Sequence, residues 1–258
     1  MPEFITSRDN PWLKSLRRLA QDNQAYRQQG EVWLEGEHLV DAVVRHGAAV
    51  RELVCAESNW SRLPTLWQAL GQRQVVLPDA LFKAISGLES PTGVGVLLAL
   101  PADASIRPDA AAVVLDRLQD AGNVGAILRS AAALGFAQVL ALSGTAALWS
   151  PKVLRAGMGA HLALTLVEGL MPDDLKALTI PVLATSSHQG PFLHELVREG
   201  RLPHPAAWLF GHEGQGVCAP LLAQASLTVR IAQPGGQESL NVAAAAAICL
   251  HASATSQT

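Results

Sequence analysis

Residues that could carry chemistry gather in three short segments of the 258-residue chain, each just after an apolar run. The first segment contains Asn123 and Arg129, the second contains Glu213 among glycines, and the third contains Ser239 and Asn241. Amides, a hydroxyl, a carboxylate and a guanidinium are suited to orienting a polar substrate and binding an anion such as phosphate. The three segments are therefore the first places to look for a functional site.

In the first segment, the residue types also have structural explanations. Asn123 stands at the start of a predicted helix, where asparagine commonly acts as a cap, and Arg129 lies six residues further along. Arginine on a helix is usually solvated. Here, however, the neighbours of Arg129 are almost all Ala, Leu and Gly, so its guanidinium has few local partners. We expect it to bind a group from elsewhere, such as phosphate.

The other two segments are rich in glycine. Gly211, Gly214 and Gly216 surround Glu213. Glycine permits backbone conformations and close ligand approach that side chains forbid, and a simple turn needs only one or two of them. In the third segment, a glycine-rich loop leads to Ser239 and Asn241, which precede an alanine-rich helix. Either residue could be the helix cap as well as a site residue.

Common nucleotide and metal signatures are absent from the sequence. The glycines of the second segment run GxxGxG, the reverse of the dinucleotide pattern, and no GxxxxGK[ST] phosphate loop occurs. The three cysteines are odd in number, far apart and without CxxC spacing, which argues against disulfides and zinc. We expect no metal site.

Short apolar runs alternate with helical patterns through the C-terminal part of the chain. This alternation predicts a mostly parallel sheet covered by helices, in which ligands bind beyond the carboxyl ends of the strands. The three chemistry-bearing segments follow such runs. The expected strands are residues 111–115, 138–142, 163–167, 180–184, 207–210 and 227–231.

The N-terminal part predicts a smaller α/β domain. Strand-like runs at 32–34, 53–55, 75–77 and 94–100 alternate with helical patterns such as 38–46 and 64–70, and the proline-containing stretch 101–108 is typical of a linker. We therefore expect a domain at 1–102, a linker at 103–110 and a second domain at 111–258. A helix over 11–29 carries Lys14, Arg17 and Arg18, either as a solvated face or as an RNA contact.

Composition narrows the class of protein. Hydrophobic residues make up 49% of the chain, charged residues 16%, and the formal net charge is −3. No stretch approaches the roughly 18 apolar residues of a membrane span, and the N-terminus lacks an export signal, so we expect a cytoplasmic protein without membrane association. The charge provides no overall attraction to nucleic acid. Any RNA contact must come from local patches.

Together the segments resemble the three motifs of the SpoU (TrmH-like) family of the SPOUT superfamily. NVGAILR, GHEGQG and ESLNV occur in the family's order and at compatible spacing. The stretches ITSRDNPWLKSL, VWLEGEHLVDAV and SPTGVGVLL are similar to the family's substrate-binding domain, and SPKVLRAGMGA to the segment between motifs one and two. Two departures are Ala232 and Gln233, where Pro-Met is frequent, and Gly157, where serine is common.

This resemblance implies a fold. It predicts an α/β protein whose C-terminal SPOUT domain has a parallel sheet and a deep trefoil knot, preceded by a small α/β substrate-binding domain. It also implies that S-adenosylmethionine binds in the knot, held largely by backbone groups around Gly211, Ile231 and Leu240.

The resemblance also implies a reaction, methylation of a ribose 2'-hydroxyl in RNA. The added N-terminal domain favours rRNA over tRNA. Family members are homodimers with the active site at the subunit interface. The expected catalytic residues are Asn123, Arg129, Glu213, Ser239 and Asn241.

Two roles within this set are open. The family's motif-one arginine, here Arg129, is assigned base-like activation, but an arginine pKa above about 12 favours phosphate orientation and electrostatic stabilisation at least equally. Glu213 could hold its guanidinium as a bidentate pair. His188, His194 and His212 are alternative bases, and His212 leads them because it lies in motif two.

Two other functions compete with this reading. One is a non-catalytic RNA-binding or ribosome-assembly factor that kept the fold, and the other is an enzyme that methylates a base. The complete set of expected catalytic residues argues against the first. The NVGAILR and ESLNV motifs argue against the second, since base-methylating branches of the superfamily have different motifs.

Overall fold

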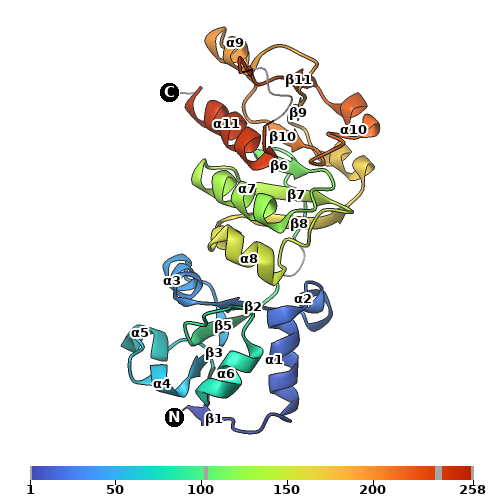
Figure 1. Cartoon of the computed structure of the whole chain (residues 1–258). Helices are drawn as coiled ribbons and strands as arrows, with labels where there is room; N and C mark the ends of the chain where they lie inside the picture. The colour runs from blue at the N-terminus through green and yellow to red at the C-terminus, as the bar shows by residue number, and fades with distance from the viewer. Residues whose placement is uncertain (1, 102–103, 236–239, 257–258) are drawn as a thin grey trace. The chain divides into compact units, whose positions relative to one another are not determined.

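The chain forms two compact units in the computed structural model, which describes residues 2–101, 104–235 and 240–256 (Figure 1). Unit 1 comprises Met1–Ala102 and Trp149–Leu162, and unit 2 comprises Asp103–Leu148 and Ala163–Thr258. The domain division expected from the sequence, 1–102 and 111–258, runs along the chain without returning. The structure differs in that the chain comes back to unit 1 at 149–162.

Unit 1 is built on a five-stranded mixed sheet. Its strand order is β1-β4-β3-β5-β2, and β5 runs antiparallel to both of its neighbours. The apolar runs expected to form strands supply the buried centre, as at Leu53, Val54 and Cys55. The strands are β1 (Glu3–Phe4), β2 (Glu31–Glu35), β3 (Val50–Ala56), β4 (Arg73–Leu77) and β5 (Val94–Ala99).

Helices pack around this sheet, and the long helix expected over 11–29 is divided in two. Asn10 begins α1 by accepting hydrogen bonds from the N–H groups of Trp12 and Leu13. The helix stops at Asp22, whose carboxylate accepts a hydrogen bond from the Gln24 N–H at 2.8 Å. Such local bonds compete with helix continuation. The helices are α1 (Pro11–Gln21), α2 (Ala25–Gln29), α3 (Glu37–His46), α4 (Glu57–Trp60), α5 (Thr65–Gln68), α6 (Asp79–Ile85) and α8 (Pro151–Gly157).

Gly157, one of the two departures from the family pattern, has a packing reason. A Cβ at this position would lie 2.5 Å from Cε1 of His161. The His161 ring is 2% exposed and packs against Trp149 with 5.1 Å between ring centroids. A serine here would force that buried pair apart. This chain therefore combines a glycine at 157 with an imidazole at 161 in one tightly packed corner of unit 1.

Unit 2 contains a six-stranded sheet in which every neighbouring pair is parallel. The order is β11-β9-β10-β6-β7-β8. Each of the six strands expected from the sequence overlaps an observed strand, so the predicted parallel α/β architecture is confirmed. The strands are β6 (Ala112–Leu115), β7 (Gln138–Leu142), β8 (Thr165–Leu170), β9 (Val182–Thr185), β10 (Ala207–Phe210) and β11 (Leu227–Val229).

The register of the central strands brings two chemistry-bearing loops together. In the β6–β10 pair, Leu115 lies opposite Phe210, and all residues of both strands are buried. Because both strands run in the same direction, the loop after β6 and the loop after β10 emerge side by side. The first and second segments are thus neighbours in space.

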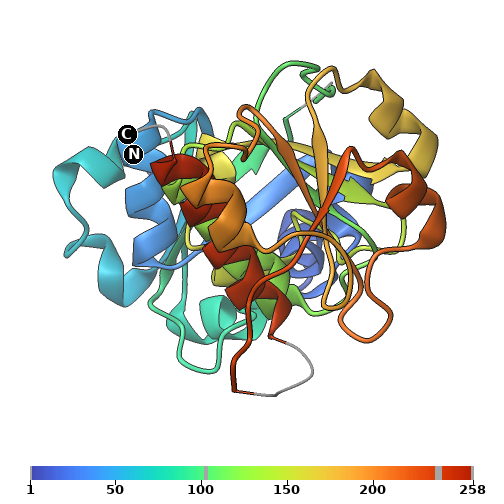
Figure 2. The same cartoon turned by 90° about the horizontal axis from the view of Figure 1, so that it is seen from above.

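Helices α7 (Ala121–Ala133) and α11 (Val242–Thr255) pack against each other on one side of this sheet, as the two views agree (Figures 1 and 2). Trp208 of β10, fully buried, donates a hydrogen bond to Ser253 of α11 at 2.7 Å. That bond attaches α11 to the sheet. Unit 2 also contains α9 (Leu193–Arg198), α10 (Ala219–Gln224) and the 3₁₀ turn η2 (Pro172–Ala177).

The end of the expected linker is bound to unit 2. The fully buried side chain of Gln138 accepts a hydrogen bond from the Arg107 N–H at 2.9 Å and donates to the carbonyls of Arg107 and Ala110. Residues 107 and 110 are therefore bound to the start of β7. The trefoil knot stays a prediction, because strand order and register do not decide how the loops cross.

Candidate active site

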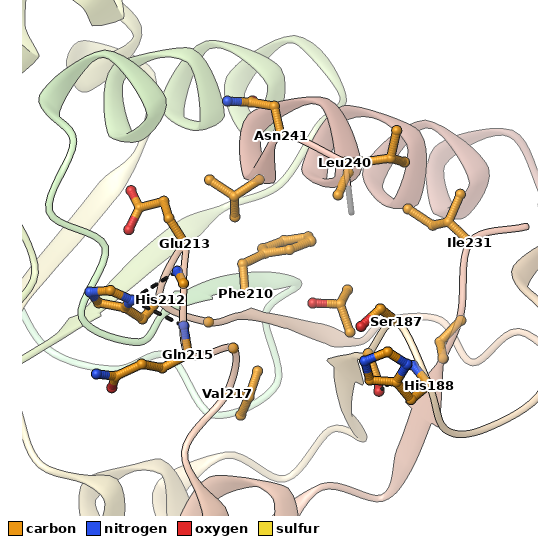
Figure 3. A pocket seen from close by; sticks show the side chains of 18 of the residues that line it. Ser187, His188, Phe210, His212, Glu213, Gln215, Val217, Ile231, Leu240 and Asn241 are labelled. Atoms are coloured by element: carbon orange, nitrogen blue, oxygen red, sulfur yellow. Dashed lines mark hydrogen bonds between the residues drawn. The ribbon is translucent and has the colours of Figure 1, made fainter. Parts of the chain in front are cut away.

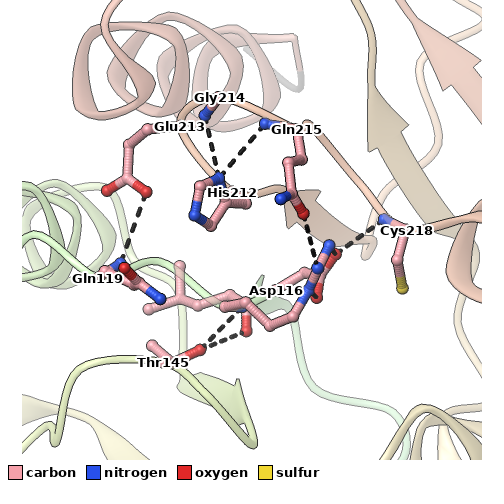
Figure 4. A network of polar contacts seen from close by, with 10 residues as sticks. Asp116, Gln119, Thr145, His212, Glu213, Gly214, Gln215 and Cys218 are labelled. Atoms are coloured by element: carbon pink, nitrogen blue, oxygen red, sulfur yellow. Dashed lines mark hydrogen bonds and ion pairs between the residues drawn. The ribbon is translucent and has the colours of Figure 1, made fainter.

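The loops after β6 and β10 are joined through Asp116 (Figure 4). Its side chain is 1% exposed and accepts hydrogen bonds from Nε of Arg117 at 2.8 Å and from the Cys218 N–H at 2.8 Å. Burial raises the pKa of Asp116, but the bonds from Arg117 and Cys218 outweigh it, and the net pKa lies below its ordinary value. The carboxylate thus fastens the far end of motif two to the end of β6.

Arg117 extends this junction. Its backbone has φ 59, a left-handed conformation that is uncommon for residues other than glycine. The Arg117 N–H donates to Oγ1 of Thr145 at 3.1 Å, and its Nη1 donates to Oε1 of Gln215 at 3.1 Å. The guanidinium therefore bridges the two loops. Sequence reasoning missed these partners, and the available signal was a charged Asp-Arg pair directly after a buried strand.

Glu213 connects motif two with motif one. Its carboxylate accepts hydrogen bonds from the Asp120 N–H at 3.3 Å, the Gln119 N–H at 3.5 Å and the Asn123 side chain at 3.4 Å. Burial raises the pKa of Glu213, while the hydrogen bonds from its own N–H and from these donors lower it further than burial raises it. Glu213 is consequently held as a carboxylate.

Glu213, Asn123 and Asn241 form a row of hydrogen-bonded side chains, the polar chain. Nδ2 of Asn241 donates to Oδ1 of Asn123 at 3.0 Å. Asn241 also caps α11 by accepting bonds from the N–H groups of Ala243 and Ala244, so it has both roles that the sequence left open. Asn123 is not a cap, since Asp120 fills that role for α7. Three expected catalytic residues, Glu213, Asn123 and Asn241, therefore meet in one place.

Arg129 stands apart from this group. It is exposed on α7, and in the described part of the chain it takes part in no hydrogen bond or ion pair. Six residues of helix turn it about 240° around the axis from Asn123. The expected pair with Glu213 is not formed, and Glu213 instead accepts hydrogen bonds from Gln119, Asp120 and Asn123. Ser239, the remaining expected catalytic residue, lies outside the described residues.

His212 shapes the motif-two loop. Its Nδ1 accepts hydrogen bonds from the N–H groups of Gly214 at 3.0 Å and Gln215 at 3.3 Å (Figure 4). An Nδ1 that accepts two bonds has its lone pair engaged, and the neutral ring then carries its proton on Nε2. His212 is therefore a poor general base in this arrangement, and its contacts are those of a positioning residue.

Two of the three motif-two glycines are required by the loop itself. A Cβ on Gly211 would lie 2.1 Å from the carbonyl carbon of Gly216, and Gly216 has φ 68. These positions close the loop onto itself. Gly214 has room for a side chain, with only the His212 ring at 3.8 Å. The number of glycines therefore reflects loop geometry more than ligand contact.

A cavity of about 830 Å³ opens beside this loop (Figure 3). Such a volume suits a ligand of nucleoside size. All three residues expected to bind a cofactor, Gly211, Ile231 and Leu240, line it. Figure 3 shows Glu213 and His212 on one side and Ser187 and His188 on the other. The aliphatic part of the lining comes largely from the third segment and includes Val229, Ile231, Leu240 and Val242.

Arg230 holds the segment that follows Ser187 and His188, the polar wall of the cavity. Its Nε donates to the Gly190 carbonyl at 2.7 Å, and its guanidinium carbon lies 4.2 Å from the Phe192 ring centroid. A Cβ on Gly190 would approach the Thr228 carbonyl oxygen to 1.9 Å, so the wall segment packs directly on β11. Sequence reasoning missed Arg230, because its partners follow β9, another strand of the sheet.

Other expectations can be compared with the described residues. Lys14 forms an exposed ion pair with Asp9, and Arg17 and Arg18 donate to Gln21 and Gln28. No helix within those residues is long and apolar enough to cross a membrane. No group of three or more His, Cys, Asp or Glu side chains that could hold a metal occurs among them either. Burial raises the pKa of the Cys55 and Cys249 thiols to about 12.

Comparisons with known proteins agree with this geometry. The family model of the SpoU rRNA Methylase family matches residues 110–251, and that of the MRM3-like substrate binding domain matches residues 10–95. The 23S rRNA (guanosine(2553)-2'-O)-methyltransferase RlmP of Bacillus subtilis is 30% identical over 84% of this chain and 86% of its own. An uncharacterized tRNA/rRNA methyltransferase of Synechocystis is 34% identical over 96% and 92%.

Solved structures give the same picture. A putative RNA methyltransferase of the TrmH family from Porphyromonas gingivalis is 29% identical with a TM-score of 0.79, covering 95% of this chain and 98% of that one. An AdoMet-bound rRNA methyltransferase from Sinorhizobium meliloti is 25% identical with a TM-score of 0.81, covering 97% of each chain. Both structures thus cover the sequence of both units.

Proposed function

The chain belongs to the SpoU rRNA methylase family, and we propose that it methylates a ribose 2'-hydroxyl of ribosomal RNA with S-adenosylmethionine as the methyl donor. The observation that carries this proposal is the cavity lined by Gly211, Ile231 and Leu240, with Glu213 and Asn241 of the polar chain also in its lining. A donor site and a substrate-orienting group thus adjoin.

The cavity fits the cofactor. Its volume, its aliphatic wall and its polar wall suit a molecule with an apolar-faced base and charged ends. Gly211, Ile231 and Leu240 would hold the cofactor, largely through their backbone groups. When bound, S-adenosylmethionine supplies an electrophilic methyl group. The residues around the cavity bind the cofactor, orient it and exclude water.

The polar chain would orient the target nucleotide. Glu213 fixes the Asn123 amide, and Asn123 in turn fixes Asn241, so the side chains are set before any substrate arrives. Such preorganisation is a large part of catalytic efficiency. Ser239 belongs to the same proposed set through the family resemblance. Arg129 would provide positive charge for a phosphate and for the oxygen that loses its proton, since a guanidinium does not act as a base near neutral pH.

We also propose a homodimer in which Arg129 serves the partner's site. In the single chain Arg129 is exposed and forms no pair with Glu213, while Ile248 on the neighbouring helix α11 is 42% exposed. A second copy would cover this surface and could bring its arginine to the polar chain. The proposal explains why an expected catalytic residue has no partner among the described residues.

Mixing two inactive variants tests this arrangement. Arg129→Ala keeps an intact Asn241, and Asn241→Ala keeps an intact Arg129. If the arginine acts in trans, random subunit exchange should restore about a quarter of wild-type activity, because half of the dimers are mixed and each has one intact site. If it acts within its own chain, the mixture stays inactive.

Unit 1 is the proposed RNA-binding part, because it matches a substrate-binding model, and Lys14, Arg17 and Arg18 are candidate phosphate contacts there. An enzyme of ribosomal RNA works where ribosomes are assembled, which supports a cytoplasmic location. Incubating the protein with rRNA and labelled cofactor, followed by nuclease digestion and mass spectrometry, tests the reaction. A 2'-O-methylated nucleotide is expected, whereas a methylated base or no methylation would favour the two competing functions.

A further inference from the structure

One polar atom of the cavity lining has no use in the proposed reaction. Oε1 of Gln233 is fully buried, and within the described residues it accepts no hydrogen bond. Gln233 lines the cavity, two positions after Ile231. Buried polar atoms in folded proteins are nearly always hydrogen-bonded, so an exception calls for a missing partner.

Three other polar side chains of the cavity lining are already engaged, and Ser187 and His188 are exposed to solvent. His212 accepts two backbone N–H groups, Glu213 accepts three bonds from the first segment, and Asn241 caps α11. Gln233 differs from all of them. Its carbonyl oxygen is a buried, unused acceptor on a residue that lines a ligand-sized space, which suits a donor supplied by the ligand once the side chain turns toward the cavity.

The surroundings indicate which part of a ligand supplies that donor. The segment that carries Gln233 also contributes the aliphatic lining residues Val229, Ile231 and Leu240. Aliphatic side chains favour the flat, apolar faces of a purine, whose polar atoms lie along its edge. A glutamine amide is complementary to the adenine edge, because its oxygen accepts from the 6-amino group while its nitrogen donates to N7.

We propose that Gln233 reads the adenine ring of the cofactor by accepting a hydrogen bond from its 6-amino group. This inference rests on the proposed function, since it assumes that the cavity holds S-adenosylmethionine. A methionine, frequent at this position in the family, has no oxygen acceptor. In this chain the side chain at position 233 therefore makes a base-specific hydrogen bond. A methionine at the same position makes only an apolar contact.

Binding of two ligands to two proteins tests the contact. S-adenosylhomocysteine and its analogue lacking the 6-amino group would be titrated calorimetrically into the wild type and into Gln233→Met. Wild type should bind the amino-free analogue about tenfold more weakly, and Gln233→Met should bind both ligands equally, at about the weaker affinity. This double cycle isolates the pair from general effects on folding.

Matched variants keep the outcome interpretable. Gln224→Met, at the end of α10 and outside the cavity lining, should retain the tenfold preference. Gln233→Leu repeats the test should the methionine variant fold poorly. An undiminished preference for the amino group in the Gln233 variants would overturn the inference. Failure of the wild type to bind S-adenosylhomocysteine at all would instead overturn the proposed function.

Discussion

Two regions of unit 2 differ in how many of their polar side chains find hydrogen-bond partners within the single chain. At the junction of the loops after β6 and β10, Asp116, Arg117, Glu213 and His212 all have hydrogen-bond partners within the chain. On the neighbouring helices α7 and α11, exposed Arg129 has none among the described residues, and Ile248 is 42% exposed. The first region is complete once the single chain has folded. In the second region, the open side, groups are left without partners among the described residues.

This difference separates two tasks. A cofactor site must exist before its ligand arrives, so its loops are cross-linked by bonds that do not depend on any partner. In the proposed homodimer, Arg129 gains its contacts only on assembly. We therefore expect mutations in the junction to affect stability and cofactor affinity, and mutations on the open side to affect the chemical step.

The largest effect is expected at Arg129. Arg129→Ala should lower the single-turnover methylation rate by about 10²- to 10³-fold and leave cofactor affinity unchanged, because the positive charge is lost where negative charge develops and the cavity is untouched. Arg129→Lys should recover part of the rate if charge dominates, and little of it if bidentate geometry is needed. A near-normal rate for Arg129→Ala would remove the open side from the mechanism. His212 could not replace it, since its Nδ1 lone pair is engaged.

The second effect, on stability, is expected at the junction. Asp116→Asn should lower the free energy of unfolding at pH 7 by about 2–4 kcal/mol in chemical denaturation, because the Arg117 guanidinium and the Cys218 N–H lose a buried carboxylate. Asp173→Asn is the matched control, since its ion pair with Lys176 is exposed and should contribute less than about 1 kcal/mol. Equal effects of both substitutions would contradict the comparison.

The same carboxylate has a defined pH dependence. The folded-state pKa of Asp116 lies below its ordinary value of about 3.9. Its stabilising contribution is therefore fully present above about pH 4 and is lost as the pH falls through the lower folded-state pKa. The stability difference between wild type and Asp116→Asn should accordingly shrink in acid. A difference that grows in acid would show that Asp116 is held by other forces.

The smallest effect is expected at the cavity wall. Arg230→Ala should raise the dissociation constant of S-adenosylhomocysteine by about tenfold, because the wall at Gly190 loses a hydrogen bond and the Phe192 contact. The methylation rate at saturating cofactor should stay close to wild type. Arg198→Ala on α9, an arginine that is 71% exposed and paired with Glu199, is the control. Calorimetry showing the same affinity for both variants would exclude a wall-positioning role.

Much of the fold follows from local patterns. All six strands of unit 2 overlap the apolar runs identified in the sequence. The pattern is clearest in β6 and β10, because a strand buried on both faces must be apolar along its whole length. The departures occur where a polar side chain acts locally. Asp22 ends α1 by binding the Gln24 N–H, and Asp120 rather than Asn123 caps α7.

The sequence by itself determined most of the strands, the order of the three motifs and, through the family resemblance, three of the residues that line the cavity. Only the tertiary structure decided which polar groups meet: Arg117 reaches Gln215, Asn123 holds Asn241 and Arg230 holds Gly190, while Arg129 does not reach Glu213. The reason is physical. Hydrophobic periodicity is read within one element, whereas these bonds join residues that are 98, 118 and 40 positions apart, and their formation depends on which strands become neighbours.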